Sequence, residues 1–93
     1  MLEKEIEQAL VRSVKNNGGR CLKFTCPGLD GVPDRLVLLP KGKCAFVELK
    51  APGKKPRPLQ IKRMKQLTAL GFLCFVIDRK EQIGGVIDAI QSA

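Results

Sequence analysis

The chain has 93 residues, enough for one domain with a single modest core over residues 1–93, and it carries 17 Lys and Arg against nine Asp and Glu. The net charge of +8 favours a polyanionic partner, either nucleic acid or anionic lipid. No apolar run approaches the roughly 20 residues of a membrane-spanning helix, and the N-terminus lacks the pattern of a signal peptide. We therefore expect a cytoplasmic protein without a membrane segment.

Residues 2–16 predict an amphipathic helix, because apolar side chains recur there at helical spacing. The Asn-Asn-Gly-Gly at 16–19 is a strong helix stop. Residues 20–26 predict a short strand, and residues 27–33, rich in turn formers, predict a loop.

Two further strands are predicted at 36–39 and 45–49, joined by a turn at 40–43. The segment 51–58 that follows has three prolines and cannot continue a strand, so it predicts a loop.

Pro58 suits the first turn of a helix that runs to about residue 70. The expected buried face of this helix carries Ile61, Met64, Leu67 and Leu70. Residues 72–77 are wholly apolar, which is typical of a central buried strand. A last helix is predicted over 81–91. Its apolar face would either cap the core or meet a second copy of the chain, and this face consists of Ile83, Val86, Ile87 and Ile90.

The predicted order is therefore helix, three strands, helix, strand, helix. The strand–helix–strand unit at 44–77 predicts a right-handed crossover that leaves the third and fourth strands parallel. The second and third strands are largely apolar on both sides, which predicts helices on both faces of the sheet. The fold class is α/β, with a mixed four-stranded sheet flanked by helices.

Two of the nine acidic residues lie at the paired strands. Asp34 precedes the first strand. Glu48 lies in the second with Lys50 two residues on, so these two side chains point the same way. A three-residue turn would place Asp34 opposite Glu48 or Lys50 on one face, whereas a two-residue turn would place it on the other. The turn sequence leaves both registers open.

Two carboxylates on one face repel each other, and a hard divalent cation that bridges them would relieve the repulsion. The adjacent lysine could then stabilise a phosphate or help to activate a water, as hydrolysis of a phosphodiester requires. The alternative is an ordinary surface ion pair at a strand edge. For an isolated E-x-K pattern this alternative is the stronger one.

The stretch GVPDRLVLLPKGKCAFVELKAPG (31–53), followed by PLQ (58–60), resembles the VRR-NUC family of the PD-(D/E)XK nuclease superfamily. The PD, the ELK, the Gly31-Val32 before them and Gln60 occur in the expected order, and the resemblance runs from Glu3 to about Ile77. It implies a restriction-endonuclease-like fold, in agreement with the element order above. It also implies a DNA endonuclease that uses Mg²⁺ or Mn²⁺ and cuts branched DNA, including four-way (Holliday) junctions.

Residue by residue, the resemblance implies that Asp34 and Glu48 are metal ligands, with the main-chain carbonyl of Leu49 as a further ligand. Lys50 resembles the catalytic lysine of the family. Gln60 resembles the glutamine that supports the site.

The superfamily often adds a glutamate from the first helix, and Glu3, Glu5 and Glu7 compete for that role. Glu3 lies nearest the apolar face of the helix and is favoured. An alternative explanation is that acidic side chains suit the N-terminus of any helix because of its dipole.

Six basic residues follow the predicted active strand and would track DNA phosphates, although a solvated face is the alternative: Lys54, Lys55, Arg57, Lys62, Arg63 and Lys65. With no Trp or Tyr and four Phe, the chain offers little for base stacking, so we expect it to read backbone shape. Paired cuts in a junction would need a homodimer.

Two competing functions remain, a non-catalytic basic nucleic-acid-binding module and a subunit of a phage or repair assembly. Under the nuclease hypothesis we expect a bacterial or phage-encoded intracellular protein without an organic cofactor.

The four cysteines do not suggest a zinc site, because they form no C-x-x-C pair and the chain has no His. We expect free thiols in or near the strands of a reduced protein, at Cys21, Cys26, Cys44 and Cys74.

Overall fold

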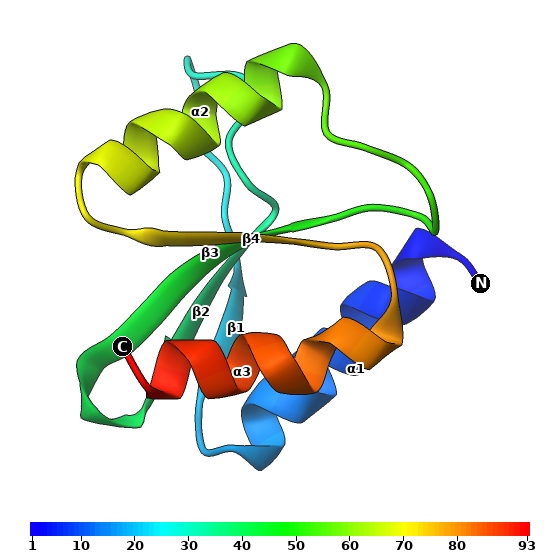
Figure 1. Ribbon diagram of the computed structural model, residues 1–93, viewed down its shortest axis with the longest axis vertical. Helices are drawn as coiled ribbons and strands as arrows, with labels where there is room; N and C mark the ends of the chain where they lie inside the picture. The colour runs from blue at the N-terminus through cyan, green and yellow to red at the C-terminus, as the bar shows by residue number, and fades with distance from the viewer.

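A mixed four-stranded sheet lies between one helix on its upper face and two on its lower face (Figure 1). The computed structural model describes all 93 residues. Neighbouring strands in the sheet are also neighbours in the chain, in the order β1 (Arg20–Lys23), β2 (Arg35–Leu39), β3 (Lys43–Leu49) and β4 (Leu73–Ile77). The pairs β1–β2 and β2–β3 are antiparallel, and β3–β4 is parallel. The predicted fold class is confirmed.

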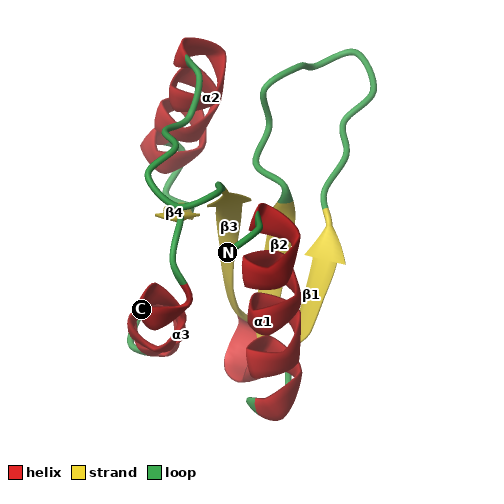
Figure 2. Ribbon diagram, turned by 90° about the vertical axis from the view of Figure 1, so that its right-hand side faces the viewer, coloured by secondary structure: helices red, strands yellow, loops and turns green.

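Three helices flank the sheet: α1 (Glu3–Asn16), α2 (Pro58–Ala69) and α3 (Ile83–Gln91). Helices α1 and α3 cover the lower face, whereas α2 lies over the upper face beside β4 (Figures 1 and 2). None of the helices combines the length and hydrophobicity that crossing a bilayer requires.

The hydrophobic core lies between the sheet and the pair α1 and α3. Helix α1 contributes apolar side chains at four-residue spacing, which places them on one stripe of the helix. Alternate residues of β3 meet this stripe, because successive side chains in a strand point to opposite faces. The core consists of Ile6, Leu10, Val14, Val37, Leu39, Ala45, Val47, Leu49, Ile77, Ile83, Ile87 and Ile90. The isoleucines of α3 therefore cap the core of their own chain and are not available to a second copy.

The hairpin between β2 and β3 has the three-residue turn Pro40–Gly42. Both Lys41 and Gly42 have positive φ, which closes the turn tightly. The register runs from Leu39 opposite Lys43 to Arg35 opposite Val47. One residue further along this register, Asp34 lies opposite Glu48. The hairpin therefore has the three-residue turn, which is the alternative that puts the two carboxylates on one face.

The wholly apolar strand at 72–77 is not central, as the sequence suggested, but an edge strand that pairs only with β3. The crossover through α2 returns the chain to the free side of β3, and no later strand covers it. Phe72 and Val76 are consequently 44% and 37% exposed. This strand is therefore hydrophobic without being buried on both sides.

The predicted buried face of α2 is only partly correct, because Met64 and Leu67 are half-buried and the other two residues are exposed. Ile61 is 41% exposed and Leu70 is 74% exposed, whereas the one buried residue of the helix is Gln60. The first strand is shorter than predicted as well and ends at Lys23. Its partner strand begins only at Arg35, after a proline that cannot donate to the ladder.

We expect Gly19→Ala to destabilise the fold by about 1–3 kcal/mol. A Cβ there would collide with the main-chain oxygen of Leu38 and lie 2.8 Å from Cδ2 of Leu39, where β1 begins to pair with β2. Equilibrium urea unfolding measures the change.

The matched control is Gly85→Ala in α3, where a Cβ would meet nothing within 4 Å. This substitution should stabilise the helix by about 0.5–1 kcal/mol. Equal effects at the two positions would contradict the close approach of Gly19 to β2.

Candidate active site

Asp34 lies directly before β2, at the edge of the sheet where β2 begins and β1 and β3 end. Its carboxylate Oδ2 accepts a hydrogen bond from the main-chain N–H of Leu49 at 2.9 Å. Its own main-chain oxygen accepts from the N–H of Phe24, also at 2.9 Å. The residue is therefore tied to β3 through its side chain and to the end of β1 through its backbone.

Glu48 is the one acidic side chain in the interior, with 1% of its surface exposed. Its Oε2 accepts from Nε2 of Gln60 at 2.6 Å and from Nζ of Lys50 at 2.9 Å. Its Oε1 is buried and has no hydrogen-bond partner. A buried carboxylate oxygen without a partner is costly, so this atom is a candidate ligand for a cation.

Burial raises the pKa of the Glu48 carboxyl above its ordinary value. The neighbouring charge of Asp34 raises this pKa further, whereas the hydrogen bond from Lys50 opposes the change. A cation at this site must therefore compete with a proton for Glu48.

Gln60 links Glu48 to the start of α2. Its Oε1 accepts from the main-chain N–H of Arg57 at 2.8 Å, and its Nε2 donates to Glu48. One side chain thus caps the helix and orients the carboxylate. Gln60 therefore lies in the first turn of α2 and contacts Glu48, while its role in supporting a catalytic site stays a prediction.

The three competing glutamates of α1 differ in their partners. Glu5 accepts from the main-chain N–H of Leu2 at 3.1 Å and so caps the helix. Glu7 pairs with Arg35 at 2.9 Å. Glu3 forms no hydrogen bond or ion pair.

A cleft of about 250 Å³ opens beside Asp34 and is lined by residues from α1 and from the end of β1. Glu3 and Glu7 are both part of its wall. Lys23 and Thr25 also line it, and sequence reasoning missed them, because nothing in the order of residues links the end of β1 to Asp34.

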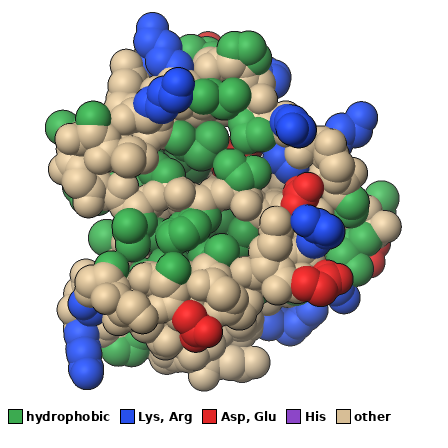
Figure 3. All heavy atoms as spheres, viewed as in Figure 1, with side chains coloured by type: hydrophobic (Ala, Val, Ile, Leu, Met, Phe, Trp, Pro, Cys, Tyr) green, Lys and Arg blue, Asp and Glu red, His purple; other side chains and the backbone are tan.

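The predicted DNA-binding residues are not equivalent. Five of them are exposed with no ion pair to the protein: Lys54, Lys55, Arg57, Lys62 and Lys65. Arg63 instead points its guanidinium at the protein and donates from Nε to the main-chain oxygen of Asp30 at 2.8 Å. Lys and Arg side chains gather along the α2 side of the face in Figure 3.

No group of three or more Asp, Glu, His or Cys side chains gathers into a metal cage. Mg²⁺ does not need one, since one or two carboxylates suffice when water and phosphate complete its shell. Asp34 and the unpartnered Oε1 of Glu48 fit that donor set. The main-chain carbonyl of Leu49 stays a predicted further ligand.

No family model matches the chain, whereas comparison with curated proteins and with solved structures gives similar proteins. The sequence is 47% identical over 88 residues to the "Putative nuclease p44" of Acyrthosiphon pisum secondary endosymbiont phage 1, covering 95% of this chain and 94% of that one. The structure resembles a solved chain described as "VRR_NUC domain" with a TM-score of 0.87 and 28% identity. That alignment covers 95% of this chain and 97% of the other.

We expect Glu48→Gln to raise the free energy of unfolding of the metal-free protein. The folded pKa of Glu48 exceeds its unfolded value, so the wild-type chain loses stability as pH rises from the ordinary value of 4.5 to the folded pKa. The gain from the substitution should therefore be larger at about pH 7.5 than at about pH 4. Urea unfolding in the presence of a chelator measures it.

Addition of Mg²⁺ or Mn²⁺ should stabilise the wild-type chain and leave Glu48→Gln unchanged. The control Glu81→Gln makes the same change of charge at an exposed position and should show neither effect. A loss of stability in Glu48→Gln at neutral pH would contradict the unfavourable burial of this carboxylate.

Proposed function

We propose that this chain, which belongs to the VRR-NUC family of nucleases, is a metal-dependent endonuclease that hydrolyses phosphodiester bonds in DNA. The observation that carries the proposal is the buried Glu48 carboxylate, which has one oxygen held by Lys50 and Gln60 and one oxygen without a partner. A buried ion pair that served structure alone would leave the second oxygen desolvated without compensation. A carboxylate with a reserved oxygen beside Asp34 suits a divalent cation.

Asp34, the Oε1 of Glu48 and the carbonyl of Leu49 would hold Mg²⁺ or Mn²⁺, with Glu3 as a further candidate. The ion, when bound, lowers the pKa of a coordinated water and polarises the phosphate. Gln60 keeps Glu48 oriented so that its free oxygen stays available. Lys50 provides an ammonium group that can stabilise charge on the phosphate as it is attacked.

The DNA contacts proposed here are electrostatic. The exposed lysines of the loop before α2 and of α2 itself supply positive charge in the segment that follows Lys50 in the chain. Three of the four phenylalanines pack on one another, with ring centroids 5.2 Å apart for Phe24–Phe46 and 5.8 Å apart for Phe46–Phe72. They are engaged in packing, so recognition through backbone shape remains the proposal.

A second candidate function is a basic nucleic-acid-binding module or assembly subunit without catalysis. In that case Glu48 and Lys50 would serve only as an internal ion pair. The unpartnered Oε1 argues against it, because a purely structural site gains nothing from a desolvated carboxylate oxygen.

Within this function we propose that the substrate is branched DNA inside the cell and that the active form is a homodimer joined at β4. The two edges of the sheet differ. Strand β1 carries Arg20 and Lys23, charges that discourage pairing with another strand. Strand β4 has no charge, proline or glycine to block its free edge.

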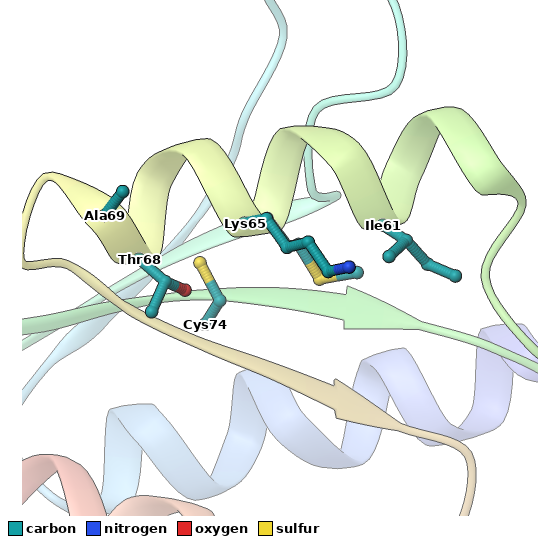
Figure 4. Close-up of a pocket in the computed structure, with 6 residues that line it drawn as sticks. Ile61, Lys65, Thr68, Ala69 and Cys74 are labelled. Carbon is teal, nitrogen blue, oxygen red and sulfur yellow. The ribbon is translucent and has the colours of Figure 1, made fainter.

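A groove of about 420 Å³ runs between α2 and β4, and Figure 4 shows Thr68 and Cys74 facing it. Hydrophobic side chains are visible on both sides of β4 in the middle of the face in Figure 3. A second copy is the proposed partner, because two β4 strands related by a two-fold axis would place the same apolar residues against each other. Two active sites at a fixed separation could then cut both strands of a junction.

We expect the wild-type chain to cleave DNA with Mg²⁺ or Mn²⁺ and not with a chelator. Asp34→Ala, Glu48→Ala and Lys50→Ala should each lower the rate by at least about 100-fold. The assay compares duplex, flap and four-way-junction substrates under each metal, and circular dichroism checks the fold of each variant.

The charge control is Lys41→Asn in the turn at the opposite end of β3. Asn tolerates the positive φ of 68° at this position, so the variant removes one charge without straining the turn. Undiminished cleavage in Glu48→Ala, or salt-sensitive binding without any cleavage by the wild-type chain, would refute the nuclease proposal.

We expect light scattering at micromolar concentration to give twice the chain mass of 10.2 kDa. Phe72→Lys should shift the mass to the monomer, because it adds a charge beside β4. Leu22→Lys, a comparable change at 41% exposure on the opposite edge strand, should leave the dimer intact. A wild-type monomer that binds a junction as a single copy would end the dimer proposal.

A further inference from the structure

The connection that carries Asp34 is docked on the first turn of α2. This connection joins β1 to β2 and rises beyond the ends of the strands (Figure 2). Gly31 has a φ of +83°, and a Cβ there would lie 2.8 Å from Cγ of Leu59 and 3.2 Å from its main-chain carbon and oxygen. The loop and the helix therefore touch backbone to backbone, which a side chain at Gly31 would prevent.

Arg63, one turn further along α2, completes this contact. Its Nε donates to the main-chain oxygen of Asp30 at 2.8 Å, and its Nη1 donates to Oε1 of Gln66 at 3.2 Å. The two bonds fix the plane of the guanidinium against the protein. The flanking Lys62 and Lys65 are exposed and form no ion pair, so they differ from Arg63 in role.

The first two turns of α2 thus touch both halves of the acidic site. Gln60 binds Glu48, while Leu59 and Arg63 contact the loop three and four residues before Asp34. We infer that Arg63 is a positioning residue, which sets Asp34 at the correct place relative to Glu48 and does not bind a DNA phosphate. The inference rests on the proposed metal-dependent function of that site.

The amide of Leu49 reports on this role without any cleavage assay. Its N–H donates to the carboxylate of Asp34. If the loop is released from α2, Asp34 moves away and this amide becomes accessible to exchange with solvent. A residue that only contacts DNA would leave the exchange rate of the free protein unchanged.

The test compares Arg63→Gln with Lys62→Gln, which makes the same change of charge one residue earlier in α2. Amide exchange by NMR is measured on the free full-length chain. The cation concentration for half-maximal cleavage and the salt dependence of DNA binding are measured as well.

Arg63→Gln should speed exchange at Leu49 by about 10-fold or more and raise the half-maximal cation concentration by a similar factor, since both depend on Asp34. Its salt slope should equal that of the wild-type chain.

Lys62→Gln should do the reverse, lowering the salt slope by about 0.9 while exchange at Leu49 stays unchanged. If Arg63→Gln lowers the salt slope by that amount and leaves Leu49 protected, the inference is overturned. Should this variant not fold, Arg63→Lys keeps the charge but lacks the planar guanidinium that donates to Asp30 and Gln66 from two separate nitrogens, and the same exchange result is expected. A wild-type chain that cuts no DNA would end the nuclease proposal, whereas exchange at Leu49 would still test the role of Arg63.

Discussion

The burial of one ionisable carboxylate constrains much of this structure. Glu48 is held inside by a lysine two residues along its own strand and by a glutamine from another element. The lysine partner requires that β3 stay extended to its end, and the glutamine partner requires that α2 begin directly above it. The position of α2 therefore follows from a polar contact rather than from a hydrophobic stripe.

The two faces of the sheet consequently have different compositions and different tasks. The face toward α1 and α3 holds the twelve-residue apolar core and supplies most of the burial that stabilises the fold. The face toward α2 holds Glu48 and Gln60, the two buried polar side chains of the molecule. Helix α2 remains largely exposed, with Gln60 as its one buried residue and with Met64 and Leu67 half-buried.

Sequence reasoning recovered the element order, the crossover and the shared direction of Glu48 and Lys50, because these depend on local periodicity and on turn residues. It left the register of the hairpin open, since one residue in the turn reverses every side chain. It assigned β4 to the centre of the sheet, because an apolar strand has the same sequence pattern whether or not another strand pairs with its free edge. Arg63 looked like its basic neighbours, and its contact with Asp30 depends on a loop 33 residues away in the chain.

The agreement between chain order and strand order has a consequence for how the protein folds. Each strand pairs with the next one in sequence, and the β2–β3 hairpin closes over a turn of three residues. Such local pairing costs little loop-closure entropy and is fast, whereas the parallel pairing of β4 requires closure of the whole crossover through α2. In this order of pairing, Asp34 and Glu48 would meet at the hairpin stage, before the helix that supports Glu48 docks. The chain can set the spacing of its acidic pair early and add the supporting contacts afterwards.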